Sequence, residues 1–359
     1  MDNPVLFVCK DPGGMNGIVP VYDAWVKGGG DAVLIANGKA AELLQQQPWP
    51  RPFRWYPTAV SAFAGIPNPA ALVTSMCSNG GIGRDLVPLL RGRCPTVALQ
   101  DFWGGALTNS WRDPECRPDS IVVNDAVGAD IVARAWPDMN RTRIVVLGYP
   151  ALDRYADLDV AALGTQVRTQ LGIGADEIVV LYAGQLERTG EMLEEVVAAL
   201  EAIGKSVCLL PRMHPRMVND APEEVARCAA ALRQFRVGRI IDSTACTTDA
   251  CVAAVTVVVS MYSTVLVEAA AVRKPAIAVL YPAVADDFQK STGGTMDDFP
   301  LVLLDACQKS TDRWSLKKAL EWAFDGAIEA WRRPAQERAF HLDGKNAERV
   351  AAFVRSLVR

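Results

Sequence analysis

Short apolar runs alternate with longer amphipathic stretches along most of the 359-residue chain. In the first half the apolar runs predict strands at Val5–Cys9, Ala32–Ala36, Ala71–Thr74, Thr96–Leu99, Ile121–Val123 and Ile144–Leu147. The stretches between them predict helices at Ile18–Lys27, Ala40–Gln46, Arg84–Arg91 and Gly128–Ala135. Because the runs are continuously apolar, they are typical of parallel strands that helices cover on both faces.

The alternation pauses at Gly148-Tyr149-Pro150 and resumes after a connector that ends near Gly174. The second series predicts strands at Ile178–Tyr182, Val207–Pro211, Arg239–Ile241, Val255–Val259, Ala276–Val279 and Leu301–Leu304. Its helices are expected at Glu191–Ala202, Glu223–Gln234, Thr264–Val272, Leu316–Trp331 and Asn346–Val358. The pattern predicts an α/β protein with two Rossmann-like domains, residues 1–155 and 156–335, followed by a C-terminal helical segment, residues 336–359.

Composition narrows the class of protein. Half of the residues are apolar, 22% are charged and the formal net charge is -4, so no global field would attract nucleic acid or an anionic membrane. The N-terminus lacks the features of a signal peptide, and the apolar run Ala250–Val259 is too short to span a bilayer. We therefore expect a cytoplasmic protein with no nucleic-acid partner and at most peripheral membrane contact, and the sequence leaves its oligomeric state open.

Cysteine and histidine usage argues against structural disulfides and metal sites. The nine cysteines are irregularly spaced, with no C-x-x-C pair, which favours reduced thiols. Only two histidines are present and there is no H-E-x-x-H, so we expect no bound metal and no cofactor.

Ligands of doubly wound sheets bind outside the carboxyl ends of the strands, so the loops that follow the strands hold the candidate residues. The first strand is followed by Asp11 and a glycine-containing segment with Gly13, Gly14 and Asn16. Such a segment lets a ligand approach the backbone, although an ordinary turn explains it equally well. Its spacing is not G-x-G-x-x-G, which disfavours a plain dinucleotide-binding fold.

A carboxylate beside two aromatic residues follows the strand Thr96–Leu99. Asp101 precedes Phe102 and Trp103, and this position is suited to a general base whose pKa is raised by desolvation. A capping aspartate with core aromatics is the alternative. Trp103 is a candidate acceptor platform, or else a core residue, which is the commoner role of tryptophan.

Two strand-end loops of the second half carry polar groups. Gly184 and Gln185 follow its first strand. Arg212, His214 and Arg216 follow the next strand and suit a diphosphate, because two guanidinium forks flank an imidazole donor. The alternative for His214 is a structural hydrogen bond.

The segment Tyr262-Ser263-Thr264 links a buried strand to a helix. Ser263 or Thr264 can cap that helix, and the same N-terminus can hold a phosphate. Glu268 lies about one turn further on and is a candidate ligand for a ribose diol. An ordinary cap would explain the hydroxyl residues but not a glutamate inside an apolar run.

These motifs resemble the nucleotide-binding half of two-domain glycosyltransferases of the GT-B fold. The resemblance rests on Arg212-Met213-His214-Pro215-Arg216, on Tyr262-Ser263-Thr264 with Glu268, on Lys274-Pro275-Ala276-Ile277 and on the tail Asp343-Gly344-Lys345-Asn346-Ala347-Glu348-Arg349. It is nearest to CDP-glycerol glycerophosphotransferases, capsule sialyltransferases and, more distantly, UDP-N-acetylglucosamine 2-epimerases. The fold then implies two domains facing across a cleft, with the last helix packing back on the first domain.

Two departures limit what the resemblance implies. The glycerophosphotransferase pattern has an aspartate immediately before the Tyr-Ser pair, where this chain has Met261. The epimerase pattern has an Arg-Arg-Glu-Asn-type loop where this chain has Gln185-Leu186-Glu187-Arg188, which speaks against epimerase activity.

The resemblance implies an inverting, metal-independent glycosyltransferase that uses a nucleotide-activated sugar or a related glycerophosphate-type donor, in cell-surface polysaccharide biosynthesis. The expected donor-site residues are Gly184, Gln185, Arg212, His214, Arg216, Tyr262, Ser263, Thr264 and Glu268. Asp101, or failing that Asp11, would be the base for an acceptor glycan, lipid or small molecule. A nucleotide-sugar epimerase or hydrolase and a non-catalytic nucleotide-binding protein remain as alternatives.

Overall fold

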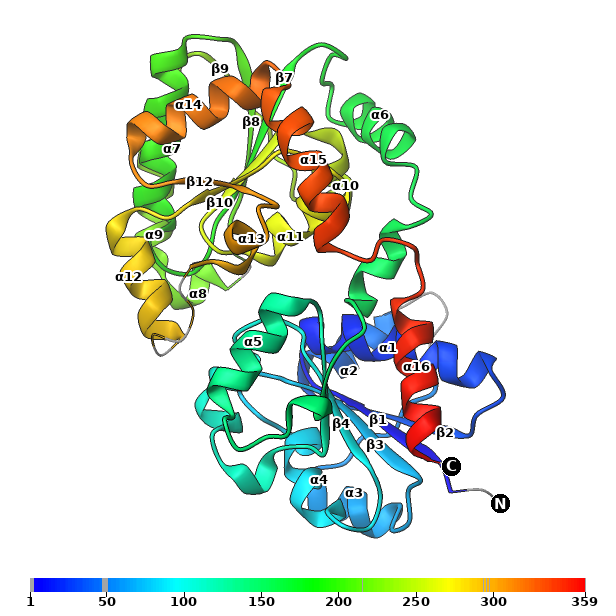
Figure 1. The fold of residues 1–359 in the computed structure, drawn as a ribbon. Coiled ribbons are helices and arrows are strands. Elements are labelled where there is room, and N and C mark those ends of the chain that lie inside the picture. The colour runs from blue at the N-terminus through cyan, green and yellow to red at the C-terminus, as the bar shows by residue number, and fades with distance from the viewer. Residues whose placement is uncertain are drawn as a thin grey trace. The chain divides into compact units, whose positions relative to one another are not determined.

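The computed structural model describes residues 3–46, 51–214, 216–292, 294, 296 and 298–358. It divides into two compact units, Met1–Ala156 with Phe340–Arg359, and Asp157–Ala339. Each unit contains one parallel six-stranded sheet with helices packed around it (Figure 1).

The first sheet has the strand order β2-β1-β3-β4-β5-β6. Its strands are β1 (Val5–Cys9), β2 (Ala32–Ala36), β3 (Ala71–Ser75), β4 (Thr96–Leu99), β5 (Ser120–Val123) and β6 (Ile144–Val146). Every residue of β1, β3, β4 and β5 is buried, which explains their continuous apolar pattern. The chain reverses its direction of travel across the sheet between β1 and β3, and this switch point is where such folds bind ligands.

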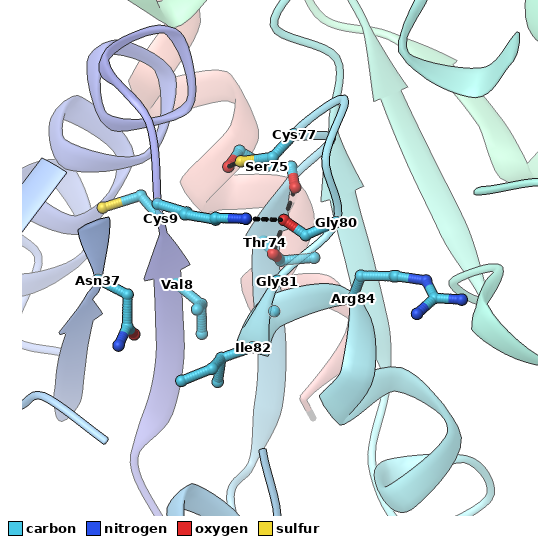
Figure 2. Close-up of a pocket in the computed structure, with 12 residues that line it drawn as sticks. Val8, Cys9, Asn37, Thr74, Ser75, Cys77, Gly80, Gly81, Ile82 and Arg84 are labelled. Carbon is cyan, nitrogen blue, oxygen red and sulfur yellow. Dashed lines mark hydrogen bonds between the residues drawn. The ribbon is translucent and has the colours of Figure 1, made fainter. Parts of the chain in front are cut away.

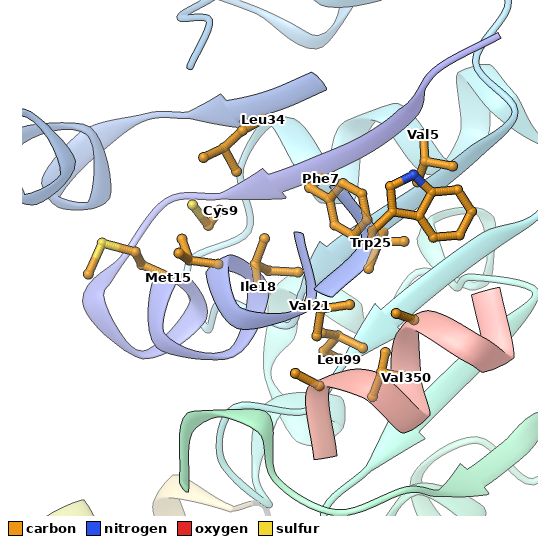
Figure 3. Packing of buried hydrophobic residues seen from close by; sticks show 14 of the residues in the cluster. Val5, Phe7, Cys9, Met15, Ile18, Val21, Trp25, Leu34, Leu99 and Val350 are labelled. Atoms are coloured by element: carbon orange, nitrogen blue, oxygen red, sulfur yellow. The ribbon is translucent and has the colours of Figure 1, made fainter. Parts of the chain in front are cut away.

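The first unit takes its last helix from the C-terminus of the chain. Its helices are α1 (Pro12–Lys27), α2 (Gly38–Gln46), α3 (Ala59–Gly65), α4 (Ile82–Leu90), α5 (Ala126–Ala135) and α16 (Asn346–Leu357). Val350 of α16 is fully buried in the same apolar cluster as Val21 of α1 and Leu99 of β4 (Figure 3). The Asp153 carboxylate accepts hydrogen bonds from the backbone N–H groups of Asn346 and Ala347, at 3.0 and 2.7 Å, and so caps α16.

The second sheet has the order β12-β11-β10-β7-β8-β9, and its switch point lies between β7 and β10. Its strands are β7 (Ile178–Ala183), β8 (Val207–Arg212), β9 (Gly238–Ile240), β10 (Val257–Ser260), β11 (Ala276–Val279) and β12 (Gln308–Ser310). Its helices are α6 (Val160–Gln170), α7 (Thr189–Ile203), α8 (Met217–Asp220), α9 (Pro222–Leu232), α10 (Thr248–Ala254), α11 (Thr264–Ala271), α12 (Pro282–Ser291), α13 (Pro300–Leu303), α14 (Arg313–Phe324) and α15 (Ala327–Ala339).

The first helix begins six residues earlier than the apolar pattern predicts. Asp11 is its N-cap and accepts a 2.7 Å hydrogen bond from the Gly14 N–H, while Pro12 occupies the first helical position. Proline is favoured there because its missing N–H would have no partner in the helix. Gly13, Gly14 and Asn16 therefore lie in the first turns of α1 and not in a loop, which corrects the sequence prediction.

Two predictions in the second unit are wrong. The segment Leu301–Leu304 is not a strand: Pro300 starts the short helix α13 there, and the edge strand β12 follows it with only three residues. The single helix expected at Leu316–Trp331 is two helices, because Gly326 adopts a left-handed conformation with φ +75° that ends α14.

Candidate functional site

Two carboxylates predicted as alternative bases meet at the carboxyl edge of the first sheet. Asp11 follows β1 and Asp101 follows β4, on either side of β3. A Cβ placed on Gly13 would lie 3.2 Å from Asp101 Oδ2 and 3.8 Å from Asp11 Oδ1. Both carboxylates thus border the first turn of α1, and the absence of a side chain at Gly13 keeps the space between them open.

The environment of Asp101 makes it a strong candidate proton acceptor. Burial, followed by the negative charge of Asp11, raises its pKa from 3.8 to about 7, and the Phe102 N–H, which donates to Oδ1 at 2.7 Å, partly offsets this rise. The Tyr149 hydroxyl donates to the Asp101 backbone oxygen and fixes the loop. A group with a pKa near 7 both accepts and releases a proton readily at neutral pH.

Sequence reasoning missed two neighbours of this pair, Ser75 and Cys77 at the end of β3. The Ser75 hydroxyl lies 3.2 Å from the Cys77 thiol, and both side chains are buried. Burial, and then the charge of Asp11, raises the pKa of the Cys77 thiol, so it stays protonated. The signal that would have found them is their place at the end of a strand, because the sequence predicted only that the cysteines are reduced thiols.

The two tryptophans near Asp101 belong to the core. Trp103 is 1% exposed and donates its indole N–H to Asp125 Oδ2 at 2.9 Å. Trp111 is fully buried and donates to the Cys77 backbone oxygen at 3.0 Å. Neither ring presents a face to an acceptor, so the structure corrects the interpretation of Trp103 as an acceptor platform.

A small pocket lies beside this edge, between β1, β3 and the start of α4 (Figure 2). Lys10 lines it, and the Lys10 ammonium donates to the backbone oxygens of Asn79 and Gly80, at 3.3 and 3.4 Å. These bonds tie the loop after β3 to the loop after β1. The loops that surround Asp11 and Cys77 are therefore held by the same cross-link at the switch point.

Glycine at position 14 is required by the contact between α1 and β3. A Cβ there would lie 2.2 Å from Ser75 Oγ, so we expect Gly14→Ala to destabilise the protein by about 1–3 kcal/mol through overpacking. Gly17 of the same helix provides the matched control, because a Cβ there meets nothing within 4 Å. Gly17→Ala is expected to stabilise by about 0.5–1 kcal/mol. Denaturant unfolding of both variants checks this, and equal effects at the two sites would contradict it.

In the second unit, three predicted loops start at the same level of the sheet. Ala183 of β7 pairs with Ser260 of β10 on one side and with Arg212 of β8 on the other. The loops that begin at Gly184, Met261 and Met213 therefore leave adjacent strands at one edge. This arrangement brings together residues almost eighty positions apart, at the switch point where a ligand is expected.

The loop after β7 is closed by Thr189. The Gly184 N–H donates to the Arg212 backbone oxygen at 2.8 Å. The Thr189 hydroxyl accepts a hydrogen bond from the Gln185 N–H and donates one to the Gln185 carbonyl oxygen, both at 2.7 Å. A Cβ on Gly184 would lie 2.5 Å from the Thr189 methyl group. Gly184 is thus required for the turn, and the backbone of Gln185 is engaged within it.

Arg212, the last residue of β8, and the residues that follow it differ in the contacts they make. Arg212 Nη1 donates to the backbone oxygens of Ser243 and Cys246, at 2.8 and 2.9 Å, so this guanidinium already serves to hold the segment after β9. Its predicted role as a phosphate fork therefore becomes mainly a positioning role. Arg216 is exposed and lies 3.4 Å from Asp220, and Pro215 of the predicted motif lies outside the described residues.

The surroundings of His214 favour its neutral form and one tautomer. Its Nδ1 accepts a 3.2 Å hydrogen bond from the Arg216 N–H. Desolvation, and then the charge of Arg216, lowers the pKa of His214, so the ring is neutral and carries its hydrogen on Nε2. Nε2–H is the group that His214 can offer to a phosphate oxygen.

Ser263 is the N-cap of α11 and accepts a 3.3 Å hydrogen bond from the Val265 N–H, and the helix begins at the exposed Thr264. The half-buried Tyr262 packs against Phe288 of α12, with ring centroids 5.2 Å apart. Glu268 is partly buried within α11, one turn after Thr264. The predicted cap is present, and the helix start faces the carboxyl edge of the sheet, as a phosphate site requires.

Arg188 also lies at this edge, and in the sequence it was noted only within the loop that departs from the epimerase pattern. Arg188 precedes α7 with φ +54°, a conformation that a non-glycine residue adopts at a cost. It forms ion pairs with Asp287 of α12 and Glu191 of α7. Burial, and then the charge of Asp287, raises the pKa of Tyr262, and the charge of Arg188 opposes this rise, so Arg188 acts electrostatically on the residue two positions before α11.

Among the residues that the structure describes, no group of three or more His, Cys, Asp or Glu side chains is arranged to hold a metal ion. Within the same residues, no helix combines the length and the apolar character that a membrane crossing needs.

Two doubly wound parallel sheets, each with polar loops at its carboxyl edge, define a protein of the GT-B type. The family model for CDP-glycerol:poly(glycerophosphate) glycerophosphotransferase matches residues 105–356, more than half of the chain. The chain belongs to this family. A search of curated proteins found no match.

Solved structures of low sequence identity share the fold. The wall teichoic acid polymerase TagF, in an H444N variant soaked with CDPG, has a TM-score of 0.60 at 14% identity, over 99% of this chain and 89% of TagF. UDP-GlcNAc 2-epimerase from Neisseria meningitidis has a TM-score of 0.70 at 10% identity, over 98% and 100%. A glycosyltransferase from Rickettsia africae has a TM-score of 0.66 at 11% identity, over 100% and 99%.

Proposed function

We propose that this protein transfers a glycerophosphate or sugar group from a nucleotide-activated donor to an acceptor hydroxyl, with inversion at the attacked atom and without a metal ion. The observation that supports it most is the half-buried Asp101, whose pKa of about 7 suits proton transfer at neutral pH. The family supports a nucleotide-linked donor, and TagF, a wall teichoic acid polymerase, supports a role in cell-surface polymer synthesis.

In this proposal Asp101 accepts the proton of the acceptor hydroxyl. The acceptor oxygen forms a bond to the donor phosphorus, or to the anomeric carbon of a sugar donor. The bond from that atom to the nucleotide phosphate oxygen breaks, and its electron pair stays on the leaving nucleotide. Inversion follows because the new bond forms opposite the leaving group.

The leaving phosphate carries the developing charge, and fixed donors of the second unit would stabilise it. His214 offers its Nε2–H, and α11 offers the positive end of its dipole at Thr264. Because these donors are held by the fold, they need little reorganisation during the reaction. This is the role that a divalent cation plays in metal-dependent transferases.

We expect the purified chain to release nucleotide from CDP-glycerol or a nucleotide sugar only when an acceptor is present, at the same rate with and without EDTA. Chromatography of the released nucleotide measures both. A rate that EDTA abolishes and Mg²⁺ restores would refute metal independence. Turnover of UDP-GlcNAc without acceptor would indicate an epimerase or hydrolase, and nucleotide binding without any turnover would refute the transferase.

A further inference from the structure

The second unit contains a cavity of about 780 Å³ that is not part of the candidate donor site. Thr256, just before β10, and Pro275, just before β11, line it together with residues of α6. These positions lie at the amino ends of the strands, whereas the donor loops leave the carboxyl ends. The cavity therefore opens at the opposite edge of the sheet.

Cations outnumber carboxylates in the wall of this cavity. Its charged lining residues are Arg168, Arg273, Lys274, Arg333, Asp159 and Glu329. Four are positive and two are negative, although the whole chain has a net charge of -4. The local excess of positive charge is therefore a property of this wall and not of the protein as a whole.

Lys274 is the cation that most needs an anionic partner. Burial, and then the charge of Arg168, lowers the pKa of its ammonium, and Glu329 opposes this effect. Arg273 forms a 3.1 Å ion pair with Glu337, which is not a lining residue, and Arg333 pairs with Glu329 inside the cavity wall. An anion beside Lys274 would thus relieve the repulsion between its ammonium and Arg168.

Hydrogen bonds hold the backbone of Lys274 and the guanidinium of Arg168 in place. The Lys274 N–H donates to the Ala269 oxygen at 2.9 Å, and the Lys274 oxygen accepts from Gln336 Nε2 at 3.1 Å. Arg168 donates through Nε to the Ala254 oxygen and through Nη1 to the Gly174 oxygen, both at 2.8 Å. Because the Arg168 guanidinium and the backbone of Lys274 are fixed before a ligand arrives, binding would mainly order the Lys274 side chain.

We infer that this cavity binds a small phosphate monoester, with the phosphate at Lys274 and the organic part against the apolar wall. A phosphate monoester carries a charge of about -1.5 to -2 at neutral pH, which balances the positive excess of the lining residues. Val160, Ile173 and Val255 supply the apolar wall. This second site does not depend on the function proposed for the opposite edge.

The inference is tested by calorimetric titration of the full chain with sn-glycerol 3-phosphate at pH 7. We expect Lys274→Met to weaken binding at least tenfold, because a charge-assisted hydrogen bond is lost. Lys205→Met is the matched control: Lys205 is an exposed lysine that pairs with Asp325 outside the cavity. His214→Ala should leave this binding event intact, and its loss in that variant would assign the ligand to the donor site and refute the inference.

A second measurement on the unaltered chain does not depend on the folding of a variant. Bound phosphate should raise the pKa of Lys274 and shield its amine, so acylation of Lys274 by a trace amine reagent should fall at least fivefold at saturating sn-glycerol 3-phosphate. Peptide mass spectrometry measures this, with Lys205 as the internal reference. Equal labelling of Lys274 with and without the phosphate would overturn the inference.

Discussion

Replacing Asp101 with asparagine is expected to lower the rate of group transfer about 10²- to 10⁴-fold, the usual contribution of a general base. Asparagine keeps the size of the side chain and can still accept the 2.7 Å hydrogen bond from the Phe102 N–H, but it cannot take a proton. Nucleotide affinity should be unchanged, because the proposed donor residues belong to the second unit. Steady-state kinetics together with nucleotide titration of the Asp101→Asn variant checks both expectations.

The pH dependence of the same reaction provides an independent test. Asp101 must be ionised to accept a proton, and its pKa is about 7. Below that pH the rate should therefore fall about tenfold per pH unit. Asp11→Asn removes the neighbouring charge that helps to raise this pKa, so the fall should move to lower pH while activity is retained. Asparagine also remains a good N-cap for α1.

Unfolding would not explain a loss of activity in Asp101→Asn. The pKa of Asp101 in the folded state is above its ordinary value of 3.8, so the folded state holds the proton more tightly than the unfolded chain does. Stability contributed by this group is present at low pH and is lost as the pH rises through about 7. Asparagine cannot ionise, and the variant should melt at or above the wild-type temperature at pH 8. Full turnover in this variant would exclude Asp101 as the base.

Replacing His214 with alanine is expected to raise the nucleotide dissociation constant about ten- to a hundredfold. Its Nδ1 is occupied by the Arg216 N–H, which leaves Nε2–H to donate to a phosphate oxygen. A hydrogen bond to a charged group contributes roughly 1.5–3 kcal/mol, which corresponds to that change in affinity. Calorimetric titration with the nucleotide measures it. The melting temperature should be nearly unchanged, because His214 lies in a strand-end loop.

Two other variants separate ligand binding from structural support. His341→Ala removes the other histidine of the chain and should leave nucleotide affinity unchanged. The hydrogen bond that His341 accepts from the Asn346 side chain goes to its backbone oxygen, which the substitution keeps. Arg212→Ala should lower the melting temperature, because the backbone oxygens of Ser243 and Cys246 lose their donor. If His214→Ala instead lowers the melting temperature and keeps its affinity, His214 is structural.

The sequence by itself determined the class of the fold and the places where chemistry was to be sought. All six strands of the first sheet were found within one residue of each end, since the strands of a parallel sheet covered on both faces are continuously apolar. Ser263 was recognised as a possible cap because capping depends on residues only a few positions apart. The start of α1 was missed although Asp11-Pro12 is a local signal, because the apolar pattern was given more weight.

The tertiary structure alone decided which of these groups meet. Asp11 and Asp101 lie at one edge of the sheet because β1 and β4 both neighbour β3, and the proposed donor loops leave adjacent strands because β7 lies between β10 and β8. Strand order and register arise from the packing of the whole sheet with its helices, and no short stretch of sequence encodes them. The same packing buried Trp103 and directed the Arg212 guanidinium to backbone oxygens. A residue type shows which interactions a side chain can make, whereas its neighbours in the folded chain determine which of them it does make.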